Sequence, residues 1–300
     1  MRTFLKVALI AAGSLLGIVC IALGAVYFVS GRHIAGHING VGHTLAVADD
    51  SATIERGRHI VNSQGMCADC HGPDLGGGMM IDVPVVARIY AANLTSGEGG
   101  VATGRTDLDW ERSIRHGVAP DGRKLIFMPS HEYTNLADDD VAAVIAYLKH
   151  LPKVDRPPVA NTAGPIARVL YLKGDFELLP AELLDQQATH LAVAPTGRTH
   201  EAGEYVAHTC AGCHGKTFSG GPIPGAPPEM KPPANITPDG IGKYTEDDFV
   251  RLLREGKRPD GSMADTTYMP VRFTKNLSDD QIAAVWAFLK TVPPKPYGGR

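Results

Sequence analysis

Apolar residues open the chain in one unbroken run. Residues 7–29 form a stretch of 23 residues without a charged side chain, preceded by Arg2 and Lys6. As a helix, this run would be about 34 Å long and would cross a hydrocarbon core of about 30 Å. The pattern predicts an uncleaved transmembrane anchor over residues 1–31. The competing interpretation is a signal peptide, whose apolar part usually spans only about 7–15 residues.

The basic residues before the apolar run predict its orientation. Because cytoplasmic flanks are enriched in positive charge, Arg2 and Lys6 place the N-terminus in the cytoplasm and the rest of the chain outside it.

Helical periodicity is clearest near the end of the chain. One apolar face has the i, i+3, i+4, i+7 spacing, with Ile282, Val285, Trp286 and Leu289. Ser278 and Gln281 form a capping box before it. An equivalent face earlier in the chain consists of Val141, Val144, Ile145 and Leu148. Ala137 occupies the cap position of that earlier helix, so we expect Asp138 to cap it.

These two helices end two copies of one longer pattern. Four segments that begin at Glu55, Ala92, Trp110 and Met128 return at Glu201, Ala234, Phe249 and Met269. The offset stays between 139 and 146 residues, which predicts a duplicated domain of about 100 residues. We place domain 1 at residues 50–152, a linker at 153–197 and domain 2 at 198–293.

The linker and both domains have few strand-like segments. The middle of the linker, VLYLKGDFELLPAELLD, is apolar enough to pack against the domains, and we expect short helical turns there. The sequence therefore predicts small, mostly helical units.

Composition narrows the classes of function. The chain is 44% hydrophobic and 20% charged, which is typical of a globular protein. Its net charge of −3 offers no basic surface, so we expect no nucleic-acid partner. Four of the five cysteines stand in two CxxCH frames, and the fifth, Cys20, lies in the apolar run. A disulfide framework is therefore not expected.

The two CxxCH frames decide the chemistry. A zinc site needs four ligands, of which one frame supplies two thiols, and a thioredoxin-like dithiol needs a strand–helix–strand setting that is absent here. A haem anchor uses every residue of the frame, because the thiols form thioethers to the porphyrin and the adjacent histidine binds iron. We therefore predict two covalently bound haem c groups, attached through Cys67, Cys70, Cys210 and Cys213, with His71 and His214 as axial ligands.

A Met-Pro pair at equivalent places in both copies predicts the second axial ligand. Met128 follows His71 by 57 residues, and Met269 follows His214 by 55. A thioether opposite a histidine raises the reduction potential, which suits an electron carrier. The alternative is that these methionines fill gaps in the core. The rival ligands are Met66, Met79, Met80 and His131 in the first copy and Met230 and Met263 in the second.

With these motifs in place, the chain resembles a duplicated class I c-type cytochrome. The segments from Ala234 and Tyr268 onward are similar to haem domains of the multihaem cytochrome subunits of membrane-bound alcohol and gluconate dehydrogenases. The resemblance implies two tandem all-α domains in which an N-terminal helix crosses the C-terminal one. Gly57 and Gly203 would then approach Tyr147 and Phe288. Those subunits usually carry three haems, whereas this chain has two motifs.

The function expected from these features is electron transfer without bond-breaking catalysis. A membrane-anchored dihaem cytochrome c would pass electrons from a dehydrogenase or quinol-oxidising complex to a terminal oxidase or soluble carrier, as part of a respiratory chain. The expected location is the bacterial inner membrane, single-pass, with the haem domains in the periplasm. The alternatives are a dihaem peroxidase and, less favoured, a zinc-binding structural module.

Overall fold

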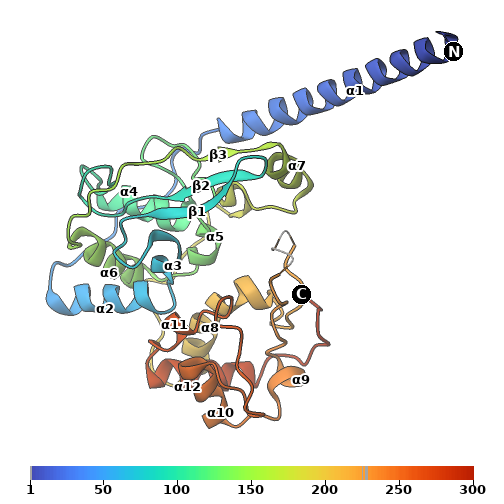
Figure 1. Ribbon diagram of the computed structural model, residues 1–300. Helices are drawn as coiled ribbons and strands as arrows, with labels where there is room; N and C mark the ends of the chain where they lie inside the picture. Colours follow the sequence, from blue (N-terminus) through green and yellow to red (C-terminus); the bar gives the residue numbers. More distant parts are fainter. Residues whose placement is uncertain (1, 225, 227–228) are drawn as a thin grey trace.

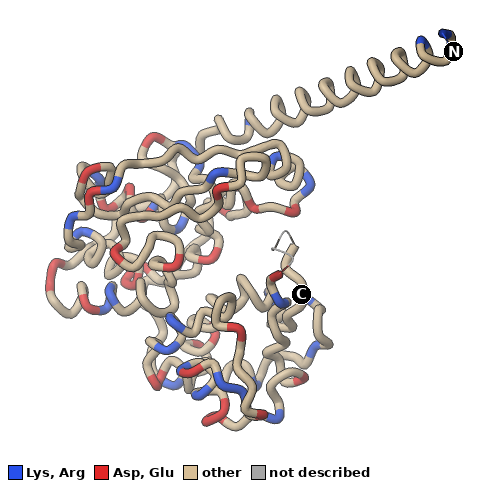
Figure 2. The backbone as a smooth tube through the Cα atoms, in the orientation of Figure 1, with Lys and Arg blue, Asp and Glu red and all other residues tan. Residues whose placement is uncertain are grey.

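The computed structural model describes residues 2–224, 226 and 229–300. It begins with one long helix, α1 (Arg2–Ile34), which projects from the body of the molecule (Figure 1). Within the described residues, α1 is the one helix whose length and composition would let it cross a membrane. Its charged residues lie only near its two ends (Figure 2).

Each copy of the repeated pattern is built on a crossing of two helices. In the first repeat (residues 50–152), α2 (Ser51–Asn62) packs on α6 (Asp138–Lys149). In the second repeat (residues 198–293), α8 (His200–His214) packs on α12 (Asp279–Leu289). Both predicted apolar faces are confirmed, because every member is at most 9% exposed.

Glycine makes these crossings possible. A Cβ on Gly57 would lie 1.9 Å from the Ala143 carbonyl oxygen and 2.8 Å from the Tyr147 Cβ. A Cβ on Gly203 would lie 2.1 Å from the Ala284 carbonyl oxygen and 2.8 Å from the Phe288 Cβ. The predicted close approach is confirmed in both repeats.

Shorter helices complete the two repeats. The first contains α3 (Cys67–His71), α4 (Asp107–Glu111), the π-helical turn η1 (Arg112–His116) and α5 (Ser130–Tyr133). The second contains α9 (Pro238–Ile241), α10 (Glu246–Glu255) and α11 (Val271–Thr274).

The predicted cap of α12 is confirmed and that of α6 is wrong. Ser278 and Gln281 form the complete capping box. At α6, the N-cap residue is Ala137, which provides no side-chain cap. Asp138 instead pairs with the buried Arg115, at 2.8 Å, because that guanidinium requires a counter-charge inside the core.

The all-α expectation needs a correction, although the fold is mostly helical. Strands β1 (Gly78–Val83), β2 (Ala87–Ala91) and β3 (Thr162–Ala163) form an antiparallel sheet in the order β1-β2-β3. The third strand comes from the linker, so the sheet depends on a contact between segments about 75 residues apart. No local sequence pattern contains that information.

The linker packs against the first repeat, as expected. It contains β3, α7 (Pro165–Lys173) and the 3₁₀ turn η2 (Pro180–Leu183), which confirms the expected short helical turns. Leu178, Leu179 and Ala167 are buried with Ile89 of β2 in one apolar cluster. The helix α7, which follows β3, lies along the last turns of α1 (Figure 1).

Candidate functional site

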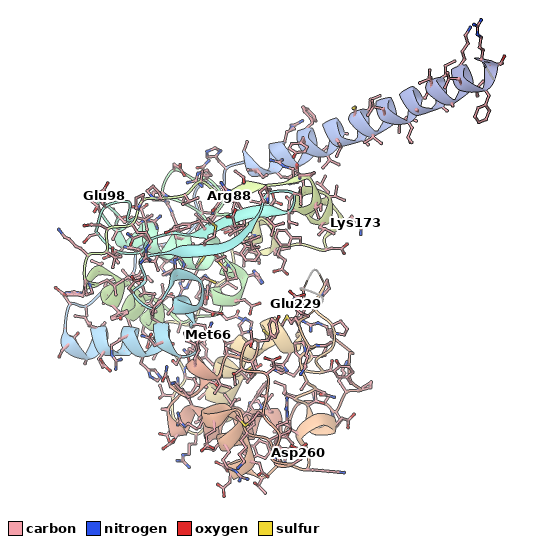
Figure 3. The ribbon with its side chains drawn as sticks, in the orientation of Figure 1. Met66, Arg88, Glu98, Lys173, Glu229 and Asp260 are labelled. Carbon is pink, nitrogen blue, oxygen red and sulfur yellow. The ribbon has the colours of Figure 1, made fainter. Side chains whose placement is uncertain are left out.

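The two CxxCH frames are both helical turns, but they differ in how they join the preceding helix. In the first repeat the frame is the separate turn α3, and in the second it is the last turn of α8. Twelve residues separate Glu55 from Cys67, whereas nine separate Glu201 from Cys210. The three additional residues interrupt the first helix, and Met66 takes a left-handed conformation (φ 47°) just before the frame (Figure 3).

Each frame histidine is fixed by one hydrogen bond from its ring to the backbone. The ring Nδ1 of His71 lies 2.7 Å from the Ala92 carbonyl oxygen, and that of His214 lies 2.7 Å from the Ala234 carbonyl oxygen. A carbonyl can only accept, so Nδ1 carries the proton and Nε2 keeps its lone pair. Burial lowers the pKa of both rings and opposes their protonation. This is the state that an axial ligand requires.

The frame cysteines are partly buried thiols. Burial raises the pKa of Cys67 and of Cys210 to about 12, and it also raises the pKa of Cys70 and Cys213. A redox dithiol needs the opposite shift, because its attacking cysteine is a thiolate near neutral pH. The described residues also contain no cluster of three or more His, Cys, Asp or Glu suited to a metal ion. Neither the dithiol nor the zinc interpretation finds support in this geometry.

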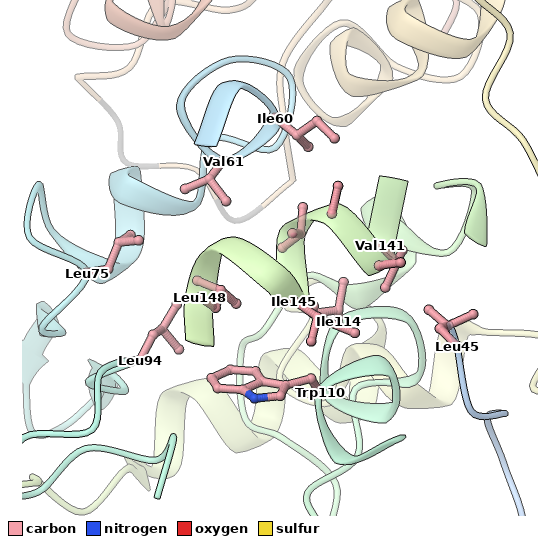
Figure 4. Packing of buried hydrophobic residues seen from close by; sticks show 13 residues of the cluster. Leu45, Ile60, Val61, Leu75, Leu94, Trp110, Ile114, Val141, Ile145 and Leu148 are labelled. Carbon is pink, nitrogen blue, oxygen red and sulfur yellow. The ribbon is translucent and has the colours of Figure 1, made fainter. Parts of the chain in front are cut away.

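A large apolar cavity opens beside the first frame. It has a volume of about 750 Å³, and Cys67, Cys70, His71 and Met128 all line it. Leu94, Ile114 and Leu148 of the core cluster also line it (Figure 4). A flat apolar macrocycle attached to the two thiols would therefore be surrounded by side chains that exclude water.

Polar groups in the cavity wall fit the carboxylates of a haem. The buried Trp110 lines the cavity, and its Nε1 has no hydrogen-bond partner (Figure 4). Arg105 also lines it, with its guanidinium carbon 4.9 Å from the Trp110 ring centroid. An indole donor and a cation next to each other suit a propionate. Phe249 occupies the position of Trp110 in the second repeat and lacks the donor.

The two candidate axial methionines have matching surroundings. Pro129 (φ −79°, ψ 58°) follows Met128, and Pro270 (φ −78°, ψ 57°) follows Met269. In each case the methionine carbonyl accepts a bond from the amide two residues on, at 2.8 and 2.7 Å. Met128 lines the cavity, and Met269 packs against the apolar cluster of the second repeat, as does Cys210.

Of the other candidate axial ligands, the structure places some in the first cavity and others outside it. Met66 and Met80 line the first cavity together with Met128. His131 is held outside it by Glu132 and Glu177, each 3.2 Å from its Nε2. Burial favours the neutral ring, but these two hydrogen bonds outweigh it and raise the pKa of His131 to about 9, so the ring is charged. In the second repeat, Met263 is 57% exposed.

Two asparagines support the sites, and the sequence analysis did not identify them. Asn93 follows Ala92, and its amide oxygen accepts bonds from the Thr95 amide and hydroxyl, at 2.9 and 2.8 Å. Asn235 follows Ala234 and has the same two bonds to Thr237 at the same distances. They hold the loops whose carbonyls accept from the histidines. The recurrence of ANLT as ANIT was the available signal.

Both frames lie where the two repeats meet. Asp69, inside the first frame, pairs with Arg272 of α11. Gly212, inside the second frame, lies next to α5, where an added Cβ would be 3.1 Å from a Glu132 carboxylate oxygen. The candidate sites therefore approach each other through their attachment turns.

Each repeat matches a cytochrome family model. Residues 201–293 match the family Cytochrome c, and residues 52–148 match the family Cytochrome C oxidase, cbb3-type, subunit III.

Three relatives are similar to 79–83% of this chain. The cytochrome c subunit of the quinone alcohol dehydrogenase of Gluconobacter oxydans is 28% identical, over 83% of this chain and 56% of that protein. The gluconate 2-dehydrogenase cytochrome c subunit of Pantoea cypripedii is 26% identical, over 83% and 62%. A diheme cytochrome c-type protein of Cereibacter sphaeroides is 28% identical, over 79% and 85%. The chain therefore carries cytochrome c domains and is homologous to the cytochrome c subunits of alcohol and gluconate dehydrogenases.

Proposed function

We propose that this protein is a membrane-anchored dihaem cytochrome c. It transfers electrons from a dehydrogenase or quinol-oxidising complex to a terminal oxidase or soluble carrier, as the electron-transfer subunit of an oxidoreductase. The observation that carries this proposal is the duplicated histidine geometry, with each Nδ1 at 2.7 Å from a backbone carbonyl and two partly buried thiols in the same turn. Electron transfer needs such fixed ligands, because small changes in geometry between oxidation states keep the reorganisation small.

Each residue of the proposed sites has one task. Cys67 and Cys70 attach the first haem, and Cys210 and Cys213 attach the second. His71 and His214 would present Nε2 to the iron, and Met128 and Met269 would each offer it a thioether. A haem bound in this way supplies one-electron Fe(III)/Fe(II) chemistry. Trp110 and Arg105 anchor a propionate of the first haem, and the apolar walls exclude water.

The partner is inferred from the relatives. Three matched subunits belong to alcohol, gluconate and fructose dehydrogenases. This chain spans 53–62% of the length of these relatives. A dehydrogenase as donor is the partner that their names support. The domains proposed are residues 50–152 and 198–293, joined by the linker 153–197 and anchored by residues 1–31.

Haem counting tests the proposal directly. The full chain, purified from a host that matures c-type cytochromes, should yield two haems c per polypeptide by pyridine haemochrome analysis. Cys70→Ala and Cys213→Ala should each lower the covalent haem content to one. Zinc without haem would refute the proposal, and a wild-type value of one would refute the dihaem assignment.

A topology experiment tests the proposed location. A periplasm-dependent reporter fused after Arg300 should be active, and the protein should stay with inner membranes after a high-salt wash. Release by salt, or a mature N-terminus beyond the apolar run, would refute the anchor.

A further inference from the structure

The helix α7 lies beside the end of the apolar helix α1. Arg168 donates from Nη1 to the Ser30 hydroxyl at 2.7 Å, and its guanidinium carbon is 4.4 Å from the Tyr27 ring centroid. One turn later, the Tyr171 ring meets the His33 ring edge-on at 5.8 Å. The contacts advance in the same direction along both helices. The N-terminal end of α7 therefore points back toward the apolar run.

These contacts fix the depth of α7. Tyr27 belongs to the apolar run of residues 7–29 and lies two residues before its end. With that run in the hydrocarbon core, Tyr27 lies at the membrane–water boundary, where tyrosine and arginine are favoured. A helix whose arginine covers the Tyr27 ring must then lie at the depth of the lipid headgroups.

The side of α7 that faces away from the protein is apolar. Ile166, Val169 and Leu172 are 45%, 39% and 40% exposed and follow each other at intervals of three residues. At about 100° per residue they share roughly one third of the helix circumference. Ala167 is fully buried against the first repeat. The polarity of this helix is thus opposite to that of an ordinary surface helix, which has its polar face outward.

The turn between β1 and β2 extends this surface. The Ile166 amide donates to the Val85 carbonyl at 3.1 Å, and the Gly164 amide donates to the Val86 carbonyl at 2.8 Å. Val83 and Val85 in this turn are 48% and 56% exposed. We call the five side chains together the α7 patch: Val83, Val85, Ile166, Val169 and Leu172.

We propose that the α7 patch inserts into the headgroup region of the same bilayer that α1 crosses. The inference rests on the proposed transmembrane placement of α1 and adds a second contact with lipid. Continuity with α1 identifies lipid as the occupant, since the patch begins at the level where the apolar run ends. Lys173 (Figure 3) is the last residue of α7 and pairs with Asp175 at 2.7 Å, so the apolar side chains carry the contact with lipid.

Insertion would set the orientation of the first repeat. Through Leu178, Leu179 and the β2–β3 pairing, the linker that carries α7 is part of the core beside the first cavity. A patch held in the headgroups therefore holds the first candidate haem site at one height above the membrane. A donor embedded in the same membrane would then meet that site in a defined geometry.

Depth-dependent fluorescence quenching tests the proposal on the full chain. The protein is placed in nanodiscs of phosphatidylcholine and phosphatidylglycerol, with a fluorescent amino acid incorporated at one position at a time. Val169 and Val85 probe the patch. Ile18, in the middle of the apolar run, probes the anchor, and Met263, 57% exposed in the second repeat, is the aqueous control. Quenching by lipids brominated near the headgroup is compared with quenching by iodide.

The expected result is that probes at Val169 and Val85 are quenched several-fold more by brominated lipid, and several-fold less by iodide, than the Met263 probe. Patch probes that behave like Met263 while the Ile18 probe is shielded from iodide would overturn this proposal and leave the anchor intact. An Ile18 probe open to iodide would overturn the transmembrane placement itself. Patch probes shielded from both quenchers would show a protein contact in place of lipid, which also overturns the proposal.

Discussion

At the scale of single residues, one hydrogen bond decides what each candidate site can do. The carbonyls of Ala92 and Ala234 hold the Nδ1 protons of His71 and His214, so that only Nε2 is available for iron. The opposite ligand is less constrained in the first repeat, because three methionines line its cavity: Met66, Met80 and Met128.

Paired substitutions separate these methionines. Met128→Leu keeps the side-chain volume but removes the thioether, so it should halve the sulfur-to-iron charge-transfer absorption of the oxidised protein and lower one reduction potential. Met269→Leu should remove the other half. Met80→Leu is the matched control and should change neither. The measurements are near-infrared absorption and a potentiometric titration. If Met80→Leu halves the band and Met128→Leu leaves it unchanged, Met80 and not Met128 is the ligand.

The charge on His131 predicts a pH dependence of stability. Its pKa is raised to about 9 in the folded protein, from an ordinary value of 6.5, because the hydrogen bonds to Glu132 and Glu177 outweigh the effect of burial. The stabilisation is complete below about pH 6.5 and is lost as the pH rises through about 9. It amounts to up to about 3 kcal/mol.

Urea unfolding of wild type and His131→Gln at pH 6 and pH 9.5 measures this contribution. The gap between the two proteins should be large at pH 6 and should nearly close at pH 9.5. A gap independent of pH would mean that His131 acts only through packing.

At the scale of elements, each repeat depends on one glycine at a helix crossing. Gly57 lies in the middle of α2 and Gly203 near the start of α8, and glycine inside a helix weakens it by roughly 0.5–1 kcal/mol relative to alanine. The close packing of α2 on α6, and of α8 on α12, offsets that cost. In each pair it lets the C-terminal helix bury its full apolar face.

Replacing glycines of α8 by alanine tests whether the close helix packing requires glycine. The control substitution lies in the same helix. Gly203→Ala should lower the free energy of unfolding by about 3 kcal/mol or more, since its methyl would lie 2.1 Å from a backbone oxygen that cannot move away. Gly212→Ala meets only the flexible Glu132 side chain, at 3.1 Å, and should be near neutral. Urea unfolding compares the two, and equal effects would mean that helix propensity dominates.

At the scale of the whole molecule, polar contacts join the repeats at the side that carries both CxxCH frames. The Tyr205 hydroxyl in α8 donates to Asp140 at 2.6 Å and accepts from the Ala137 amide at 2.9 Å, both at the start of α6. Thr209 donates to the Gln64 carbonyl at 2.8 Å. These bonds, with the Asp69–Arg272 pair, position one frame against the other.

Removing the Tyr205 hydroxyl should loosen this arrangement. Tyr205→Phe leaves the part-buried Asp140 carboxylate and the Ala137 amide each without one partner, at a cost of about 1–3 kcal/mol. Hydrogen exchange should rise at the start of α6 and in α8. Tyr244→Phe is the control, because its hydroxyl has no hydrogen bond within the described residues. Unchanged exchange in Tyr205→Phe would show that the repeats are held together by other contacts.

The sequence by itself determined the features that depend on neighbours along the chain. The apolar run, the duplication, the faces of α6 and α12, the Ser278 cap and the CxxCH spacing are all local patterns, and most of the helical fold follows from them. The close approach at Gly57 and Gly203 followed from the family resemblance.

Only the tertiary structure decided the remaining features, because each of them depends on a contact between residues far apart in the sequence. Asp138 failed as a cap because Arg115, buried in the same core, required its charge. The linker supplied β3 because β2 had an open edge. His71 met the Ala92 carbonyl 21 residues later because Asn93 shapes that loop. Such pairings carry no periodic signal, since each is fixed by a single contact between remote residues.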